Sequence, residues 1–480
     1  MTDLIRHSNQ QTITLTEEIA NSGEGKVWET NLNGYLAKIY HKPTPARIAK
    51  LKVMLANPPA DPMLIHNHVS IAWVSDLLKD SNGKYVGFLM PEIENSKSLF
   101  SICNPSRRKK VASGFNWYYL HVTALNTAWI IQSIHAKGYV LGDIKLENIL
   151  VNNRAMTAVI DTDSFQVRDT SAKKIYLCTV GSEGFTPPEL IGKDFHKVKQ
   201  SQNQDRFRIA VLMHYLLFGY HPFSGSWTGV GECPEQSELI KHGYWYGAPN
   251  SPIRENDSTI PLDVLHPKLK QLFLQCFNDG HELSHLRPTA KDWHKALEVA
   301  VNDLTACSRI DSHYYSKHYG KCYWCDRTDI LNVDIFPGTA GSAKIPYKER
   351  NYRPPKVSKK YKKETIFIVD NYSNQNNVLS NSITSSYNKN LKQIQYNKHL
   401  ASNPIIVFIR NNYVISIISF FCILFLLILL QINTVQYKTK NHNINFKSEF
   451  EKRRQRVFDL SVLVISNGDI YSNSHTHEVQ

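Results

Sequence analysis

Residues 139–167 read YVLGDIKLENILVNNRAMTAVIDTDSFQV, and the interpretation of the whole chain starts from this stretch. Asp143 and Asn148 flank a predicted tight turn, and Lys145 lies between them. Two short apolar runs, ILV and AVI, follow this turn and predict the strands of a hairpin that ends at Asp161. The stretch is therefore expected to gather two carboxylates, an amide and an ammonium group around one small volume.

This set of side chains suits the transfer of a terminal phosphoryl group. One carboxylate orients the attacking hydroxyl, an amide and a second carboxylate hold Mg²⁺, and an ammonium group neutralises the moving charge. We therefore interpret four residues as catalytic, namely Asp143, Lys145, Asn148 and Asp161. Of these, Asn148 and Asp161 are the candidate Mg²⁺ ligands. The alternative is a hairpin with polar turn residues, in which each aspartate has only a structural role.

The order of these residues resembles the protein-kinase superfamily, whose catalytic loop reads H-R-D-L-K-x-x-N and is followed by D-F-G. Residues 141–148, LGDIKLEN, and residues 161–163, DTD, match that pattern. The wording G-D…N and I-D-T-D-S-F-Q is similar to a divergent group of bacterial kinase-like proteins. The resemblance implies an α+β, bilobal kinase-like domain over residues 1–304, with an N-lobe at about 10–93 and a C-lobe at about 94–304.

The N-terminal part of this domain has the features of an antiparallel sheet. Residues 12–41 alternate in polarity and carry turn signals. Residues 20–27, ANSGEGKV, align with the kinase pattern G-x-G-x-x-G-x-V, and residues 86–93 resemble the hinge that binds adenine. The alternatives are an ordinary glycine-rich turn and a solvated strand lysine. The resemblance implies that ATP is contacted by Gly23, Gly25, Val27, Lys38 and Ile93.

Three departures from the kinase pattern concern positions that normally carry a charge or the D-F-G glycine. No glutamate occurs between Lys38 and Met90, although residues 45–56 predict the helix that normally carries one. Either another group positions the lysine, or the site is catalytically weak. Asp163 replaces the glycine of D-F-G and is interpreted either as a further Mg²⁺ ligand or as a cap of the following turn. Gly142 replaces the arginine that receives an activation-loop phosphate, so control by that route is not expected.

The C-terminal lobe offers three supporting interactions. Residues 115–137 predict the helix that supports the catalytic loop. The resemblance implies that Ser182 bonds to the catalytic aspartate and lysine, and that Glu189 pairs with Arg287. It also implies that Asp205, at the start of a helix, hydrogen-bonds to the backbone of the catalytic loop. The alternative for these acidic and basic residues is an ordinary surface charge.

A cysteine–histidine pattern follows the kinase-like domain, at residues 305–328. Its spacing is C-x5-H-x8-C-x2-C, with ligands Cys307, His313, Cys322 and Cys325. Three thiolates and an imidazole suit a closed, tetrahedral structural Zn²⁺ site. The alternatives are a redox C-x-x-C pair and free buried thiols, and His318 is the rival histidine. The resembling bacterial group carries a similar stretch at this point.

The remaining sequence predicts a tether. Residues 329–412 are polar and basic and are expected to form a disordered linker. Residues 413–432 include YVISIISFFCILFLLILL, an uncharged run that suits one transmembrane helix. Flanking charges do not decide the orientation, so we place the kinase-like domain in the cytoplasm because it needs ATP and reduced thiols. Residues 433–480 form a tail without a functional interpretation.

Composition limits the kind of protein and its partners. The 480 residues include eight cysteines without even spacing, which argues against a disulfide scaffold. The net charge of +14 suggests a polyanionic neighbour such as a nucleotide or lipid headgroups, and no nucleic acid partner is expected. The resemblance also implies a PP2C-type phosphatase and a von Willebrand A-type protein as partners.

We therefore predict a membrane-tethered, ATP- and Mg²⁺-dependent kinase that phosphorylates Ser or Thr hydroxyls of a protein substrate. One alternative is a pseudokinase scaffold that binds nucleotide without efficient transfer, which the missing glutamate favours. Another is a kinase-fold enzyme that acts on the hydroxyl of a small molecule.

Overall fold

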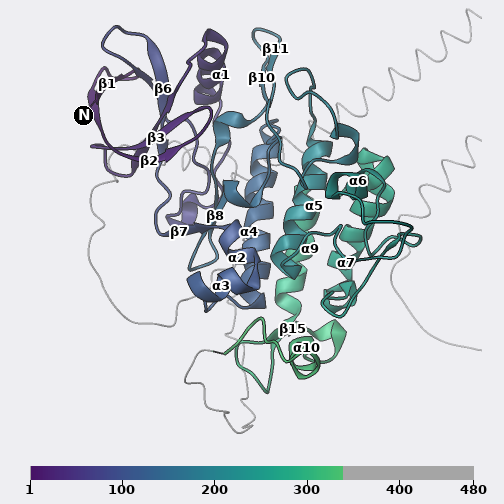
Figure 1. Cartoon of the computed structure of the whole chain (residues 1–480). Helices are drawn as coiled ribbons and strands as arrows, with labels where there is room; N and C mark the ends of the chain where they lie inside the picture. The colour runs from purple at the N-terminus through teal and green to yellow at the C-terminus, as the bar shows by residue number, and fades with distance from the viewer. Residues whose placement is uncertain (1, 339–480) are drawn as a thin grey trace, which may run out of the picture. The chain divides into compact units, whose positions relative to one another are not determined.

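The computed structural model describes residues 2–338, and the structural statements below concern this part of the chain. Its first part is a closed antiparallel barrel with the strand order β1-β2-β3-β4-β6-β5 (Figure 1). The strands are β1 (Thr2–Arg6), β2 (Thr12–Asn21), β3 (Gly25–Thr30), β4 (Tyr35–Tyr40), β5 (Asp76–Lys79) and β6 (Tyr85–Pro91). The predicted sheet over residues 12–41 is confirmed. The sheet begins before residue 10, because β1 pairs with β2 and buries Leu4 in the same apolar cluster as Leu15.

Helix α1 (Pro45–Ala56) follows β4 and confirms the helix predicted at these residues. The Thr44 hydroxyl accepts a hydrogen bond from the Arg47 amide at 3.2 Å, and a proline takes the first helical position, where its missing N–H costs no hydrogen bond. The buried face of α1 contains Lys50 together with Leu51 and Met54. A buried lysine requires a polar partner, so α1 brings a charged group as well as apolar side chains to the interior.

The larger part of the described chain is helical and surrounds α4 (Trp117–Ala136), as Figure 1 shows. Most of the side chains of α4 are buried, as expected for a helix that is apolar on nearly every side. It packs against α5 (Gln202–Phe218) and α9 (Ala290–Asp303). The helix predicted over residues 115–137 is thereby confirmed.

The start of α5 differs from the prediction that Asp205 opens this helix. Ser201 is the N-cap, and the Gln204 side-chain oxygen accepts a hydrogen bond from the Ser201 amide, which completes a capping box. Asp205 therefore lies inside the first turn. The other helices are α2 (Leu99–Cys103), α3 (Pro105–Val111), α6 (Gln236–Lys241), α7 (Pro267–Leu274) and α8 (Gly280–Glu282), and α7 continues into a π-helical turn, η6 (Gln275–Asp279).

Residues 139–167 include two strands of a small sheet between the barrel and the helices. Strands β8 (Ile149–Asn152) and β9 (Thr157–Val159) form the predicted hairpin, and β7 (Ser96–Ser98) pairs with β8. The 3₁₀ turn η2 (Leu146–Asn148) leads into β8, and η3 (Thr162–Ser164) follows β9. Two further two-stranded ribbons are β10 (Val167–Asp169) with β11 (Lys174–Tyr176), and β12 (Ser226–Trp227) with β13 (Ile253–Arg254).

The predicted Cys/His segment forms a compact knuckle on the helical lobe. It consists of the ribbon β14 (Leu304–Ala306) and β15 (Tyr314–Ser316), followed by α10 (Tyr323–Leu331). Trp324 of α10 makes an edge contact with Trp117 of α4, with ring centroids 4.9 Å apart. Phe336 is buried and packs on Trp324, with ring centroids 4.7 Å apart, so the chain stays in contact with the knuckle beyond residue 328.

Within residues 2–338, no helix combines the length and the hydrophobicity that crossing a bilayer requires. The predicted transmembrane helix at residues 413–432 lies outside the described residues. The same holds for residues 339–412 of the predicted linker and for the tail at 433–480.

Candidate active site

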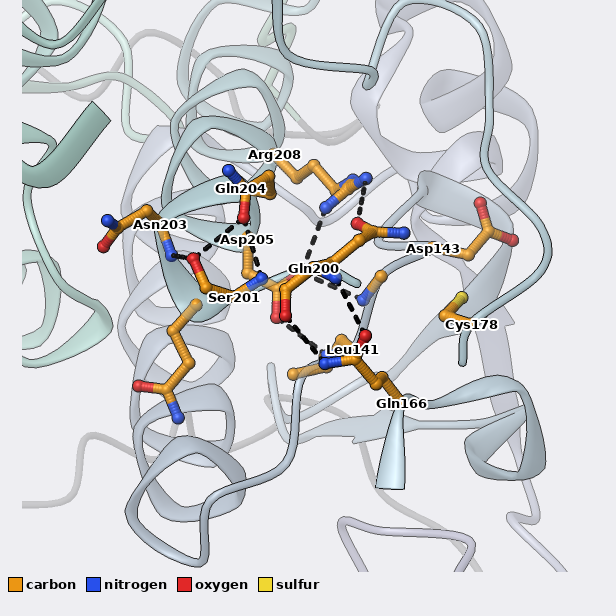
Figure 2. Close-up of polar contacts among 12 residues, drawn as sticks. Leu141, Asp143, Gln166, Cys178, Gln200, Ser201, Asn203, Gln204, Asp205 and Arg208 are labelled. Carbon is orange, nitrogen blue, oxygen red and sulfur yellow. Dashed lines mark hydrogen bonds and ion pairs between the residues drawn. The ribbon is translucent and has the colours of Figure 1, made fainter. Parts of the chain in front are cut away.

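A buried carboxylate on α5 holds the backbone of the predicted catalytic loop. Asp205 accepts hydrogen bonds from the amides of Leu141 at 2.7 Å and Gly142 at 2.9 Å, as Figure 2 shows. His135 and Arg208 contact the same carboxylate at 3.0 and 3.2 Å. Burial alone would raise the pKa of Asp205, but these two partners and the loop amides hold it below its usual value. Asp205 therefore fixes the backbone immediately before Asp143, as the resemblance implied.

The place of the expected arginine is closed by neighbouring side chains. A Cβ atom on Gly142, whose φ is +75°, would lie 2.6 Å from the Cys178 sulfur. Gln166 and Gln200 lie in the same region in Figure 2, where the Gln166 side chain donates to the Gln200 carbonyl at 2.7 Å and accepts from its amide at 2.8 Å. Arg208 donates to the Gln200 side chain at 2.8 Å. The segment after the second aspartate is thus tied by amide groups to Gln200, which the Arg208 guanidinium joins to α5.

Three of the four predicted catalytic residues meet around one carboxylate. The Ser182 hydroxyl donates to Asp143 Oδ1 at 2.7 Å, and Lys145 Nζ lies 2.9 Å from Asp143 Oδ2. Asn148 donates its side-chain N–H to the Asp143 carbonyl at 3.1 Å. Burial lowers the pKa of Lys145, but Asp143 and, to a smaller extent, Asp161 raise it above the usual value. The predicted contact between Ser182 and the aspartate is confirmed, and the arrangement leaves a charged lysine beside the carboxylate.

The fourth predicted residue, Asp161, joins the small sheet to the barrel. Its backbone is in the left-handed region at φ 57° and ψ 38°, which turns the chain sharply after β9. Asp161 Oδ1 accepts from Lys38 Nζ at 2.6 Å. Burial is the main cause that raises the pKa of Asp161, and Lys38 opposes that rise. For Lys38 itself, burial acts to lower the pKa, but the two facing carboxylates keep it above its usual value.

Asp163 is a site residue whose position the sequence analysis did not anticipate. Its Oδ1 lies 2.7 Å from Lys38 Nζ, and its Oδ2 accepts from the Tyr40 hydroxyl at 2.8 Å. Lys50 Nζ donates to the Asp163 carbonyl at 2.6 Å. The turn-capping interpretation is wrong, because both carboxylate oxygens contact side chains of β4. An acidic residue at the D-F-G glycine in a chain without the helix glutamate was the signal that could have suggested this pairing.

The predicted nucleotide residues of the N-lobe are spread over the β2–β3 turn, strands β3 and β4 and the end of β6. A Cβ atom on Gly25 would lie 2.4 Å from a carbonyl oxygen of β4, so this glycine is required for the close pairing of the two strands. Gly23, at the tip, has open space around it. Val27 lies opposite Lys38 in the pairing of β3 with β4. Ile93 is half-buried and follows the end of β6. These placements leave the nucleotide roles as predictions.

The predicted pair between Glu189 and Arg287 is confirmed. The Arg287 guanidinium is fully buried and donates to both oxygens of Glu189, at 2.7 and 2.8 Å. This bidentate pair joins the loop of η4 (Pro188–Leu190) to the segment before α9. Burial raises the pKa of Glu189, but Arg287 more than offsets this and holds the pKa below its usual value.

Glu189→Gln is expected to reduce the free energy of unfolding by about 2 kcal/mol or more at neutral pH, because it leaves the buried guanidinium without a charged partner. A carboxylate whose pKa is lowered on folding stabilises the protein above its unfolded pKa of about 4.3 and loses that effect as pH falls through the folded value. The difference between wild type and variant should therefore shrink below about pH 4. Urea unfolding at several pH values measures this, and a difference that is constant with pH would contradict it.

The four predicted metal ligands converge in the knuckle. Their ligand atoms all lie within 4.8 Å of one another. His313 Nδ1 is 3.5 Å from Cys325 Sγ and 3.7 Å from Cys322 Sγ, and the sulfurs of Cys307 and Cys325 are 3.5 Å apart. In a tetrahedral site with Zn–S bonds of about 2.3 Å, neighbouring ligand atoms lie about 3.5 to 3.8 Å apart. The donor set and its spacing therefore fit Zn²⁺.

The alternative that His318 is the histidine ligand is wrong. Its Nδ1 atom contacts Asp303 at 3.0 Å, and His318 lies outside the cluster. The structure adds a residue that the sequence analysis missed. Asp334 accepts from His313 Nε2, with both carboxylate oxygens at 3.1 Å. A ligating histidine commonly donates its second N–H to a carboxylate, which directs the other nitrogen toward the metal. Asp334 thus presents Nδ1 of His313 to the three sulfurs.

Comparisons with known proteins agree with this geometry. The family model described as Protein kinase domain matches residues 63–296. Protein kinase YegI of Escherichia coli O157:H7 is 32% identical over 322 residues, which cover 65% of this chain and 48% of that protein. Protein kinase YegI of Escherichia coli strain K12 is 32% identical over 327 residues, with 66% and 49% covered. Serine/threonine-protein kinase 33 of Bos taurus is 26% identical over 257 residues, with 48% and 51% covered.

The chain spans about half the length of the curated relatives it matches. The range matched by the family model contains the catalytic loop and Asp161, whereas Lys38 and the glycine-containing turn precede it. Together with the site geometry, the match at residues 63–296 supports a protein kinase-like phosphotransferase domain, and the chain is similar over this region to bacterial proteins named protein kinase.

Proposed function

We propose that this protein transfers the γ-phosphoryl group of Mg-ATP to Ser or Thr hydroxyls of a protein substrate. The observation that carries the proposal is the pairing of Asp143 with Ser182 and Lys145, on a loop that Asp205 fixes from below. This is the arrangement that phosphoryl transfer requires of an orienting carboxylate and its charged neighbour. The similarity to proteins named protein kinase supports the same reaction class.

The roles of the side chains follow from their contacts. The attacking hydroxyl donates a hydrogen bond to Asp143 Oδ1. It replaces the Ser182 hydroxyl, which donates to the same oxygen in this structure. Lys145 stays beside Oδ2 and screens the transferred group. Asn148 uses its N–H to brace the loop, which leaves its carbonyl oxygen as a metal ligand. Asp161 offers Oδ2 to the metal while Oδ1 faces Lys38.

Mg²⁺, when bound, neutralises the charge that develops between the β- and γ-phosphates. The oxygen donors of Asn148 and Asp161 are the type that this hard cation prefers. Lys38 lies next to the second of these donors, within 2.6 Å of its carboxylate. It is therefore placed to bind the α- and β-phosphates at the same end of the site.

The decisive experiment is transfer of ³²P from γ-labelled ATP by the full chain, with protein acceptors from a lysate and small-molecule hydroxyls as separate reactions. Label in protein supports the proposal. Label in a small molecule supports the alternative of a small-molecule kinase. Nucleotide binding without any transfer overturns the proposal and indicates a pseudokinase scaffold.

We further propose that Cys307, His313, Cys322 and Cys325 bind one structural Zn²⁺ ion. Their mutual distances and the carboxylate behind His313 support a closed site with no open position. The ion would join the loop between β14 and β15, which carries Cys307 and His313, to the start of α10, where Cys322 is the N-cap and Cys325 lies in the first turn.

Asp334→Ala is expected to weaken Zn²⁺ binding about 10- to 100-fold, because His313 then loses the carboxylate that fixes its orientation. Competition with a chromophoric chelator measures the affinity. Asp329, on the exposed side of α10, provides a control, since Asp329→Ala removes a surface carboxylate that pairs with Arg309. Equal zinc affinities in both variants would contradict the role of Asp334.

We also propose that residues 413–432 anchor the protein in a membrane by one helix, with the kinase domain in the cytoplasm. The uncharged run in the sequence supports this. Retention of the full chain in membranes after an alkaline carbonate wash tests the anchor, and release into the supernatant would overturn it. By resemblance alone, a PP2C-type phosphatase and a von Willebrand A-type protein are the partners we propose to seek by co-purification.

A further inference from the structure

The ammonium group of Lys38 lies between two carboxylates that differ in their access to solvent. The Asp161 side chain is 33% exposed, whereas the Asp163 side chain is 3% exposed. Both contacts are short, at 2.6 and 2.7 Å. Asp161 therefore faces the open part of the site, where a metal ion can reach it, and Asp163 lies behind the lysine.

Asp163 is itself fixed at three points. Its Oδ1 faces Lys38 and its Oδ2 accepts from Tyr40, and these two residues lie two positions apart on the same face of β4. Its carbonyl oxygen accepts from Lys50 of α1 at 2.6 Å. The carboxylate thus has a single orientation, set by one strand of the barrel and by the helix that follows it.

Helix α1 supplies a cation where the resembling kinases supply an acid. Its sequence, PARIAKLKVMLA, contains no acidic residue, and the side chain that it directs toward Asp163 is that of Lys50. Yet a buried ammonium such as Lys38 needs a counter-ion to remain charged and in place. Once a metal ion draws on Asp161, the other carboxylate in contact with Lys38 is Asp163.

We infer that Asp163 is a positioning residue that holds Lys38 toward the nucleotide phosphates, the task for which the helix of other kinases provides a glutamate. Lys50 and Tyr40 in turn hold Asp163. In this arrangement Asp161 binds the metal ion, and Asp163 positions Lys38. This inference rests on the proposed nucleotide site, but it concerns nucleotide affinity and is separate from whether transfer occurs.

The first test is the affinity of the full chain for Mg-ADP, measured by calorimetry. Asp163→Asn keeps the size of the side chain and removes its charge, and it should weaken binding about 10- to 100-fold, the effect of losing one charged hydrogen-bonded partner. In kinetics with ATP, the variant should raise KM more than it lowers kcat. Wild-type affinity in a folded Asp163→Asn protein would overturn the inference.

The second test moves the carboxylate to α1. The double variant Asp163→Asn with Lys50→Glu places an acid at the position of α1 whose side chain reaches the Asp163 backbone, and it should recover most of the lost affinity. The matched control, Asp163→Asn with Lys50→Gln, has no added charge and should recover none. A purely structural role for Asp163 predicts equal affinity in the two double variants, and that result would also overturn the inference.

A third measurement covers the case in which Asp163→Asn does not fold. Tyr40→Phe removes only the hydroxyl that bonds Asp163 Oδ2, and acetylation by an N-hydroxysuccinimide ester followed by mass spectrometry reports the reactivity of Lys38. Looser positioning should increase labelling of Lys38 relative to Lys26, which is paired with Glu18 at the surface. Unchanged relative labelling would overturn the inference. Wild-type protein that binds Mg-ADP without transferring phosphate would instead count against the proposed function alone.

Discussion

Asp143→Asn is expected to lower kcat for phosphoryl transfer to protein about 10³-fold, while the affinity for Mg-ADP stays within about twofold of wild type. The amide has the same shape, but it cannot take the proton of the attacking hydroxyl or attract Lys145 by charge. Both effects act on the reacting oxygen and not on the nucleotide. Initial rates with γ-labelled ATP, together with calorimetric binding of Mg-ADP, measure the two quantities.

A matched control is Asp169→Asn, which makes the same chemical change on β10. Asp169 is a half-buried residue whose carboxylate accepts hydrogen bonds from the amide and the hydroxyl of the nearby Ser171. This variant should keep wild-type activity. If Asp143→Asn retained more than about a tenth of the wild-type kcat, far above the loss expected for a catalytic base, Asp143 would not be the orienting carboxylate.

Cys325→Ser is expected to abolish binding of the Zn²⁺ ion and to lower the melting temperature by about 10 °C, because a structural zinc site contributes its binding energy to folding. Cys325 is buried, and its sulfur lies 3.5 Å from both Cys307 Sγ and His313 Nδ1. A serine hydroxyl at this position is a poor ligand for the ion. Zinc content by mass spectrometry and thermal unfolding by circular dichroism measure the two effects.

Two comparisons make this result specific. Cys233 is an exposed cysteine outside the cluster, so Cys233→Ser should leave both zinc content and melting temperature unchanged. Treatment of wild type with a strong chelator should reproduce the melting temperature of Cys325→Ser. A wild-type protein purified without zinc and with the melting temperature of Cys325→Ser would show that the four residues only pack together.

The features that could be predicted from the sequence are the local ones. The catalytic-loop residues Asp143, Lys145 and Asn148 lie within six positions, so their spacing alone brings them together. The buried helices were found because their apolar side chains recur along one segment. The pair of Glu189 with Arg287, 98 positions apart, was found only through the resemblance.

The parts that were missed depend on contacts between distant segments. Lys38 and Asp163 are 125 positions apart, and the residues next to each of them in the sequence do not indicate that they pair. Asp334 lies 21 positions after His313, beyond the segment recognised by its cysteines. In both cases the sequence showed a charged residue, and the fold was needed to show which opposite charge it meets.

The closed space above Gly142 bears on how this protein could acquire control by a phosphate on the segment after Asp161. An arginine there would need room for its first side-chain carbon, which Cys178 already occupies, and a left-handed backbone that disfavours it. One base change that introduced the arginine would therefore damage the loop before any phosphate sensor could arise. An arginine at position 142 would first require a smaller residue at position 178 and weaker hydrogen bonds between Gln166 and Gln200. Such a change therefore needs several coordinated substitutions.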